Sequence, residues 1–205
     1  DMRPTGPDLV ASFIDGVVGA GVDVLNIGLC STDGLYFASG KLNIPGAMFT
    51  ASHNPAEYNG IKLCRAGAAP VGQDTGLAQI REMLESENLP NYDGPAGSST
   101  NEDMLTAYAQ YLRELVPLEK IRKLSVVIDT GNGMGGYTVP AVLSDRVLAA
   151  LPLEIDELFF DLDGTFPNHE ANPIDPENLR DLQTRVIEVG ADLGLAFDGD
   201  ADRCF

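Results

Sequence analysis

The sequence predicts two consecutive α/β domains with mixed, largely parallel sheets flanked by helices. Short apolar segments suited to buried strands alternate with segments whose apolar residues recur every three or four positions, and the alternation resumes in the second half. Such alternation is typical of parallel strands covered by helices. Between the halves, residues 86–100 are dense in Pro, Gly, Ser, Asn and Asp, which indicates a linker. We therefore expect one domain at residues 1–95 and another at 96–205.

The first domain is expected to begin with a helix at residues 6–19, because its apolar residues fall on one face and Pro7 suits the first turn. Asp74 is expected to cap the last helix of this half. The other expected elements are a strand at 22–29, a helix at 32–39, and strands at 45–50 and 60–64.

The second domain is expected to begin with a helix that Asn101 caps and that carries Leu105 to Leu115. Gly190 suits the end of its last helix, since glycine readily adopts the left-handed conformation found there. The other expected elements are strands at 124–129, 153–160 and 193–197, and helices at about 140–148 and 175–189.

The composition excludes several classes of protein. The formal net charge is −18, which argues against non-specific binding to nucleic acid or to an anionic membrane surface. No stretch approaches the ~20 apolar residues of a membrane span, and no signal peptide is evident, so we expect a cytoplasmic protein. The three cysteines are scattered and are predicted to be free thiols. Because Asp1 is not a methionine and Phe205 ends the chain where a strand should continue, we expect a piece of a longer protein.

Two polar loops, each following an apolar strand, carry the candidate chemistry. The first is Thr50-Ala-Ser-His-Asn-Pro55, whose Ser52 is a candidate nucleophile or phosphate carrier. The second, Asp198-Gly-Asp-Ala-Asp-Arg203, places three carboxylates at alternate positions with small residues between them. Small residues let such a loop curl so that its carboxylates converge on a cation, and Mg²⁺ favours a few carboxylates together with a phosphate oxygen. A solvated acidic turn is the alternative.

Two cationic side chains lie where phosphate chemistry would need them. Arg203 follows the acidic loop directly and is able to neutralise a phosphate by bidentate hydrogen bonding. Lys62 follows the serine loop by ten residues and is a candidate general base, provided that nearby cations depress its pKa. An ordinary surface lysine is the alternative reading of Lys62.

Two further motifs suggest other functions. The glycines of residues 131–136 resemble a dinucleotide-binding turn, but the spacing is irregular, and a tight strand-to-helix turn is favoured. A role in shaping the active-site cleft stays open. Asp161-Leu-Asp163-Gly-Thr165 after an apolar strand is the nucleophile pattern of haloacid-dehalogenase-type phosphatases. Against that reading, the motif lies deep in the second half and runs into a turn-dense stretch. A phosphatase using Asp161 and a non-enzymatic divalent-cation-binding module therefore stand as alternatives.

Taken together and in order, several motifs resemble the α-D-phosphohexomutases, most nearly the bacterial phosphomannomutase/phosphoglucomutase group. The resemblance covers essentially the whole chain. It rests on residues 50–55, on Asn59-Gly-Ile-Lys62 and Gly131-Asn-Gly133, on Phe166-Pro-Asn-His169, and on residues 198–203. It also accounts for Asp161, since members carry an Asp-Gly-Thr-Phe-Pro-Asn-His loop at this point.

The resemblance implies an intramolecular phosphotransferase of four domains. This chain would supply domain one without its first strand and most of domain two, with domains three and four elsewhere in the polypeptide. It implies that a phosphoserine exchanges its phosphoryl group with a hexose 6-phosphate or hexose 1-phosphate (mannose and/or glucose) through a hexose 1,6-bisphosphate, and that the fragment alone has little or no activity. The implied roles are Ser52 as phosphoserine, Asp198, Asp200, Asp202 and the Ser52 phosphate as Mg²⁺ ligands, His53 and Lys62 as acid/base candidates, and Arg3, Asn54 and Arg203 as residues that position phosphate or the loop.

Overall fold

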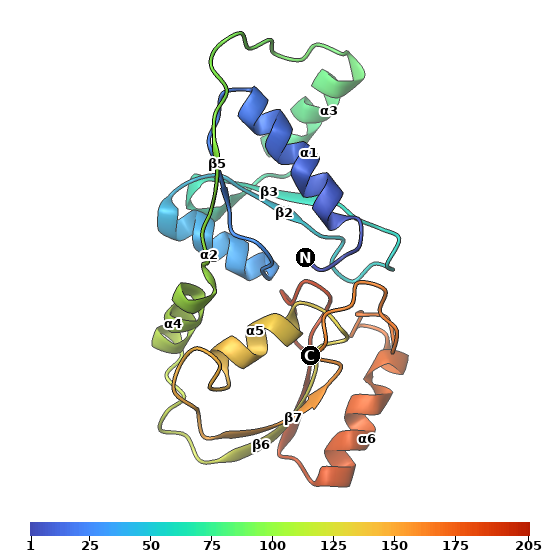
Figure 1. The fold of residues 1–205 in the computed structure, drawn as a ribbon. Coiled ribbons are helices and arrows are strands. Elements are labelled where there is room, and N and C mark those ends of the chain that lie inside the picture. The colour runs from blue at the N-terminus through green and yellow to red at the C-terminus, as the bar shows by residue number, and fades with distance from the viewer.

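The computed structural model describes all 205 residues and has two stacked halves, each with its own sheets and helices (Figure 1). The predicted architecture of two consecutive α/β domains is confirmed. The helices and strands of the first half, in chain order, are α1 (Gly6–Gly19), β1 (Val24–Asn26), α2 (Thr32–Leu42), β2 (Gly46–Phe49), β3 (Ile61–Arg65), β4 (Ala69–Pro70) and α3 (Leu77–Glu85). Those of the second half are β5 (Ser99–Asn101), α4 (Leu105–Leu115), β6 (Leu124–Asp129), α5 (Gly135–Val142), β7 (Leu153–Leu158), α6 (Arg180–Val189) and β8 (Leu193–Ala196). Short 3₁₀ turns lie at Ala66–Ala68, Gln73–Thr75 and Pro176–Leu179.

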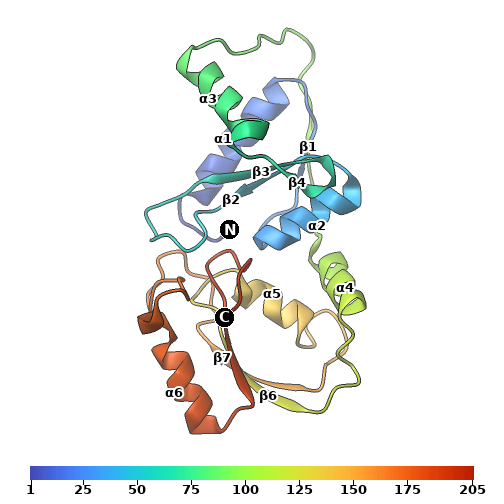
Figure 2. The ribbon, with the colours of Figure 1, turned by 180° about the vertical axis from the view of Figure 1, so that it is seen from behind.

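The first half combines two small sheets. Strands β2, β3 and β4 form an antiparallel sheet, and β1 pairs in parallel with β5. Helices α1 and α3 lie on one side of the antiparallel sheet and α2 lies on the other (Figures 1 and 2). Strand β5 therefore pairs across the expected boundary near residue 95, and the placing of that boundary stays a prediction.

The second half is built on a parallel sheet of order β7-β6-β8 whose two faces pack against different helices. Alternate residues of a strand point to opposite faces. Val126 and Ile128 of β6 pack with Val139 of α5, whereas Val127 packs on the other face with Leu182 of α6. The central strand β6 is thus buried on both faces, and its carboxyl end lies where the candidate site begins.

Local sequence signals explain where several helices begin and end. Ser31 caps α2 by accepting a hydrogen bond from the Gly34 amide, and Asn43 ends that helix in the left-handed conformation. Asp175 caps the turn before α6, and Gly190 closes that helix at φ 65°.

Two expected caps are wrong. Asp74 lies inside a 3₁₀ turn, and Gly76, with φ 153°, precedes α3 instead. Asn101 ends strand β5, and Asp103 accepts the hydrogen bond from the Leu105 amide at the start of α4. At Asp74 the chain forms a 3₁₀ turn, and at Asn101 it forms a strand, so neither residue is in a position to cap the following helix.

The helix expected at residues 140–148 is displaced toward the N-terminus. Helix α5 begins at Gly135, directly after the glycine-rich turn, and contains Pro140. Residues beyond it are irregular because the Arg113 side chain of α4 donates hydrogen bonds to the carbonyls of Val142, Ser144 and Ala149. A long-range arginine contact therefore satisfies carbonyls that a longer helix would have satisfied internally.

None of the helices has both the length and the apolar character needed to cross a bilayer.

The buried centre of β6 leads to a stability prediction. Ile128 has no exposed surface, so Ile128→Ala is expected to lower the free energy of unfolding by about 2–5 kcal/mol. Ile187 of α6 is 81% exposed, and Ile187→Ala is the matched control, with an expected change within about 0.5 kcal/mol. Urea denaturation monitored by circular dichroism measures both. Equal effects of the two substitutions would contradict this assignment of the core.

Candidate functional site

The serine loop leaves β2 after Phe49 and returns to β3 at Ile61. Its tip is strained, because Ser52 has φ 53°, a conformation that non-glycine residues rarely adopt. The loop compensates with local bonds: the Ser52 amide donates to Thr50 Oγ1 at 2.8 Å, and the Thr50 amide donates to the Gly60 carbonyl at 3.0 Å. These bonds present the half-buried Ser52 hydroxyl at the surface that faces the second half.

Arg3 holds this loop from behind. Its side chain is buried, and its guanidinium donates to four loop carbonyls at 2.7–3.0 Å, those of Ser52, Asn54, Pro55 and Tyr58. Of the two roles that the resemblance implied for Arg3, these contacts favour positioning the loop over contacting phosphate. The Asn54 residue itself is exposed at the tip.

A loop of the second half supports Arg3 in turn. The Phe166 ring lies 5.2 Å from the Arg3 guanidinium carbon, a cation–π distance. Phe166 has φ 53° and its amide donates to the Asp163 carbonyl at 3.0 Å. Gly164 is required here, because a Cβ at this position would lie 2.6 Å from the Arg3 Cα. The Asp-Gly-Thr-Phe motif thus braces the serine loop from across the domain contact.

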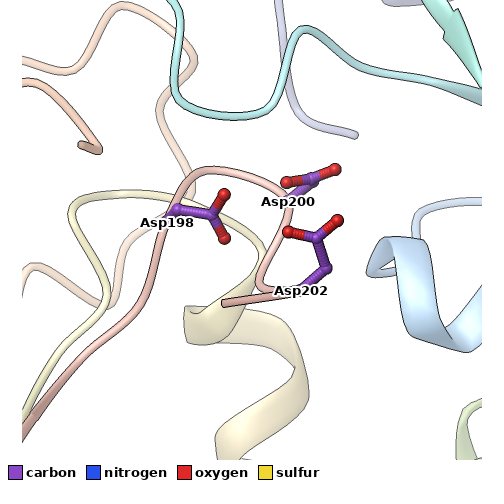
Figure 3. A group of neighbouring side chains, drawn as sticks. All are labelled: Asp198, Asp200 and Asp202. Atoms are coloured by element: carbon purple, nitrogen blue, oxygen red, sulfur yellow. The ribbon is translucent and has the colours of Figure 1, made fainter. Parts of the chain in front are cut away.

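The acidic loop follows β8 and gathers its three carboxylates as predicted. One oxygen from each of Asp198, Asp200 and Asp202 lies within 4.8 Å of the others, and Figure 3 shows the three side chains on a single turn. Asp198 and Asp200 are fully buried. Asp200 Oδ1 and Asp202 Oδ1 are buried without a hydrogen-bond partner. Asp202 Oδ1 lies 3.5 Å from Arg203 Nε, whereas Asp200 Oδ1 has no partner of either kind among the contacts of this cluster. A buried carboxylate oxygen that accepts no hydrogen bond is costly, and a hard divalent cation is a ligand that fits it.

Lys62 of β3 lies against this cluster. Its ammonium is 2.6 Å from Asp200 Oδ2 and 2.8 Å from Asp202 Oδ2. Burial lowers the pKa of Lys62, but the hydrogen bonds to the two carboxylates outweigh burial, so its pKa is raised. The general-base hypothesis required a depressed pKa, and this arrangement does not provide one. The alternative of an ordinary surface lysine is also wrong, since Lys62 bridges two carboxylates.

The two loops meet directly at Ser52. Its hydroxyl donates to Asp198 Oδ2 at 2.9 Å and accepts a hydrogen bond from Arg203 Nη2 at 2.8 Å. Arg203 also donates through Nε to Asp198 Oδ2 at 2.9 Å and lies 2.6 Å from His53 Nδ1. Burial, followed by the charge of Asp200, raises the pKa of Asp198. An arginine, an imidazole and a carboxylate therefore surround one hydroxyl.

Glycines allow the backbones to approach this closely. A Cβ on Gly199 would lie 2.5 Å from the Ser52 carbonyl oxygen. A Cβ on Gly133 would lie 2.7 Å from the Gly199 carbonyl oxygen, and the Met134 amide donates to that same oxygen at 2.9 Å. The glycine-rich turn at 131–136 therefore packs against the acidic loop and leads directly into α5, as a tight strand-to-helix turn would.

Sequence reasoning missed Thr32, the first residue of α2. Its hydroxyl donates to Asp200 Oδ2 at 2.5 Å and its amide donates to the Asp200 carbonyl at 3.0 Å. Burial raises the pKa of Asp200, but hydrogen bonds from Lys62 and Thr32 outweigh it, so the pKa is lowered. The signal available was a polar residue at the carboxyl end of an apolar segment, adjacent to the capping Ser31.

Asp161 and Asp163 lie outside the acidic cluster. The Asp161 residue is exposed, and its carbonyl accepts a hydrogen bond from the Asn132 side chain. Asp163 Oδ1 accepts hydrogen bonds from the amide and hydroxyl of Thr165. These contacts stabilise a turn and give no support to the phosphatase alternative.

Sequence reasoning also missed the contact between His169 and Asp129, which lies at the end of β6. His169 Nε2 lies 3.0 Å from Asp129 Oδ2, and Nδ1 lies 2.9 Å from the Glu170 carbonyl. Both ring nitrogens face acceptors, so the imidazolium form satisfies both contacts. The hydrogen bond to Asp129 raises the pKa of His169, although burial opposes it. This pair ties the loop that carries Phe166 to the central strand.

The fold and the site define a two-domain α/β arrangement in which a serine loop meets an acidic loop whose three carboxylates could hold a metal ion. Comparison with known families gives the same result for both halves. Residues 1–91 match α/β/α domain I, and residues 106–205 match α/β/α domain II, of phosphoglucomutase/phosphomannomutase. The chain belongs to the phosphoglucomutase/phosphomannomutase family.

Individual relatives agree with this assignment. The chain is 40% identical over 207 residues to a phosphomannomutase from Salmonella montevideo, covering 100% of this chain and 45% of the relative. It is 40% identical over 204 residues to a phosphomannomutase/phosphoglucomutase from Pseudomonas syringae, covering 99% and 41%. The crystal structure of a phosphoglucomutase/phosphomannomutase family protein from Burkholderia thailandensis superposes with a TM-score of 0.81 at 34% identity, covering 98% and 43%. The chain thus spans less than half the length of the relatives it matches.

The contact between the two loops predicts the effect of a single methyl group. Gly199→Ala is expected to lower the free energy of unfolding by about 1–3 kcal/mol, because its Cβ would meet the Ser52 carbonyl at 2.5 Å. Gly16→Ala is the control, because a Cβ there meets nothing within 4 Å, and in a helix interior it is expected to stabilise by up to about 1 kcal/mol. Urea denaturation of both variants tests the contact. A neutral Gly199→Ala would show that the loops separate easily.

The His169–Asp129 pair predicts a pH dependence of stability. Because the pKa of His169 is raised in the folded state, its contribution is fully present below the unfolded pKa and is lost as pH rises through the folded pKa. His169→Gln should therefore reduce stability more at about pH 5.5 than at about pH 8.5. Urea denaturation of wild type and variant at both pH values measures this difference. A difference that does not change with pH would contradict the charged pair.

Proposed function

We propose that this chain carries the phosphoserine loop and the metal-binding loop of a phosphohexomutase, which interconverts hexose 6-phosphate and hexose 1-phosphate, with mannose and/or glucose as the sugar. The observation that carries the proposal is the position of the Ser52 hydroxyl. It lies on a loop of the first half, within hydrogen-bonding distance of Asp198 and Arg203 on a loop of the second half, and the carboxylate cluster adjoins it. The names of the relatives support the same reaction.

Each residue has a role in the proposed reaction. The bond between phosphorus and Ser52 Oγ breaks as the free hydroxyl oxygen of the hexose phosphate bonds to phosphorus, and the hydroxyl proton passes to His53. Lys62, held as an ammonium by Asp200 and Asp202, contributes positive charge at the carboxylate cluster instead. The product is a hexose 1,6-bisphosphate, which returns its other phosphoryl group to Ser52 Oγ. Arg203 donates hydrogen bonds where the phosphoryl oxygens would lie, and Arg3 keeps the loop in place. Positioning and neutralisation of charge dominate such transfers.

Mg²⁺ is the proposed cofactor, held by Asp198, Asp200 and Asp202 together with the Ser52 phosphate. When bound, it supplies positive charge that offsets the charge of the phosphoryl group. The buried oxygens on Asp200 and Asp202 that accept no hydrogen bond support this assignment. It also predicts that metal binding tightens when Ser52 is phosphorylated, because a ligand is added, whereas a mere cation-binding module would be indifferent to phosphorylation.

The relatives are more than twice as long as this chain, since it covers 41–45% of their length. We propose that mutase activity belongs to a polypeptide that also contains domains three and four, and that these 205 residues alone have little or no mutase activity.

A phosphopeptide map tests the phosphoserine. The full-length protein, incubated with glucose 1,6-bisphosphate and Mg²⁺, is expected to carry acid-stable phosphate on Ser52. Ser52→Ala should abolish that label, whereas the control Asp161→Asn should retain it, because Asp161 lies outside the cluster. An acid-labile phosphate that disappears in Asp161→Asn instead would refute the mutase proposal in favour of a phosphatase.

A further inference from the structure

Thr32 joins the two halves at the acidic cluster itself. It begins α2 of the first half, is completely buried, and makes two hydrogen bonds to Asp200 of the second half. The amide bond to the Asp200 carbonyl fixes the loop backbone, and the hydroxyl bond to Oδ2 fixes the side chain. The adjacent Ser31 is occupied in capping α2, so the Thr32 hydroxyl is free to bond outside its own helix.

The two oxygens of Asp200 have different surroundings. Oδ2 accepts hydrogen bonds from Thr32 at 2.5 Å and from Lys62 at 2.6 Å. Oδ1 is buried and has no hydrogen-bond partner. A carboxylate held in this way cannot rotate to satisfy Oδ1 without giving up two bonds on Oδ2. Oδ1 is therefore kept available for a cation.

We propose that Thr32 is a positioning residue for metal binding: by fixing Oδ2 and the backbone of Asp200, it keeps Oδ1 of that residue available to a divalent cation. This inference rests on the proposed metal site. Partners that orient a metal ligand typically contribute 10- to 100-fold in metal affinity, so the loss of one hydroxyl is expected to be measurable. Lys62 alone does not replace it, because Lys62 is also shared with Asp202.

The contact has a thermodynamic consequence because it spans the halves. Anything that binds only the arrangement in which Thr32 contacts Asp200 stabilises that arrangement by mass action. Metal binding should therefore hold α2 against the acidic loop, and opening of that contact should become rarer as the site fills.

Metal titration of matched variants tests the inference without measuring turnover. The full-length protein and its variants are titrated with Mn²⁺ as the probe, and free Mn²⁺ is followed by electron paramagnetic resonance. Thr32→Val keeps the shape of the side chain and is expected to weaken Mn²⁺ binding by about 10-fold or more, and Thr32→Ser is expected to restore most of the affinity. Ser39→Ala is the control, because Ser39 is a buried hydroxyl of the same helix that bonds to Ile44 and Arg65 carbonyls instead.

The outcomes separate the inference from the proposed function. If Thr32→Val binds Mn²⁺ as tightly as wild type, or if Thr32→Ser is as weak as Thr32→Val, the inference is overturned while the metal site stands. If wild type shows no saturable binding, or if Asp202→Asn binds equally well, the metal site itself is refuted and the inference with it. A loss of affinity in Ser39→Ala equal to that in Thr32→Val would also overturn the specific role.

A measurement on the unaltered protein covers the case in which Thr32→Val does not fold. Hydrogen exchange of the Thr32 amide reports opening of its bond to the Asp200 carbonyl. Saturating Mg²⁺ should slow this exchange several-fold, while the Ile44 amide, which donates to the Ser39 carbonyl in the same half, should be unaffected. Equal exchange of the Thr32 amide with and without Mg²⁺ would overturn the inference.

Discussion

The approach of two backbones, Gly199 to the Ser52 carbonyl, is the constraint on which the site depends. No side chain fits between them, since even a Cβ on Gly199 would lie 2.5 Å from that oxygen. Only this separation allows the Ser52 hydroxyl to reach Asp198 and Arg203 at the same time. The sheets, which share no strand pairing between β2-β3-β4 and β7-β6-β8, each deliver one loop to this point. The site therefore forms only where the two domains dock.

Charge explains why the docked arrangement needs partners from both domains. Buried carboxylates in a chain of net charge −18 would repel one another and lose hydration. Lys62 from the first domain and Arg203 from the second each bridge two of the three carboxylates. The neutralisation is incomplete, because buried oxygens on Asp200 and Asp202 still lack hydrogen bonds. The cation proposed for this cluster would offset the remaining negative charge and that of the proposed Ser52 phosphoryl group.

Much of this was predictable from the sequence, and the rest depends on contacts between distant segments. The strands at β2, β6 and β8 follow from apolar runs, and the two polar loops follow from their positions after those strands. The start of α5 could not be predicted in this way, because it is determined by the glycine-rich turn that packs under Gly199. Thr32 and Phe166 were missed as site residues for the same reason: each acts on a residue more than 150 positions away in the sequence.

Three non-glycine residues at the site have strained backbone conformations, and contacts between the two domains help to maintain them. Ser52, Phe166 and Ala201 all have φ between 53° and 55°, although none is glycine, and such conformations cost about 1–3 kcal/mol each. Each of the three lies in a loop that contacts the other domain, and Arg3 satisfies the Ser52 loop while Phe166 supports Arg3. Local hydrogen bonds alone therefore do not account for these conformations, and contacts between the domains help to maintain them. A ligand that strengthens the docked arrangement, such as the cation proposed at Asp200, would therefore also hold the Ser52 hydroxyl beside Asp198 and Arg203.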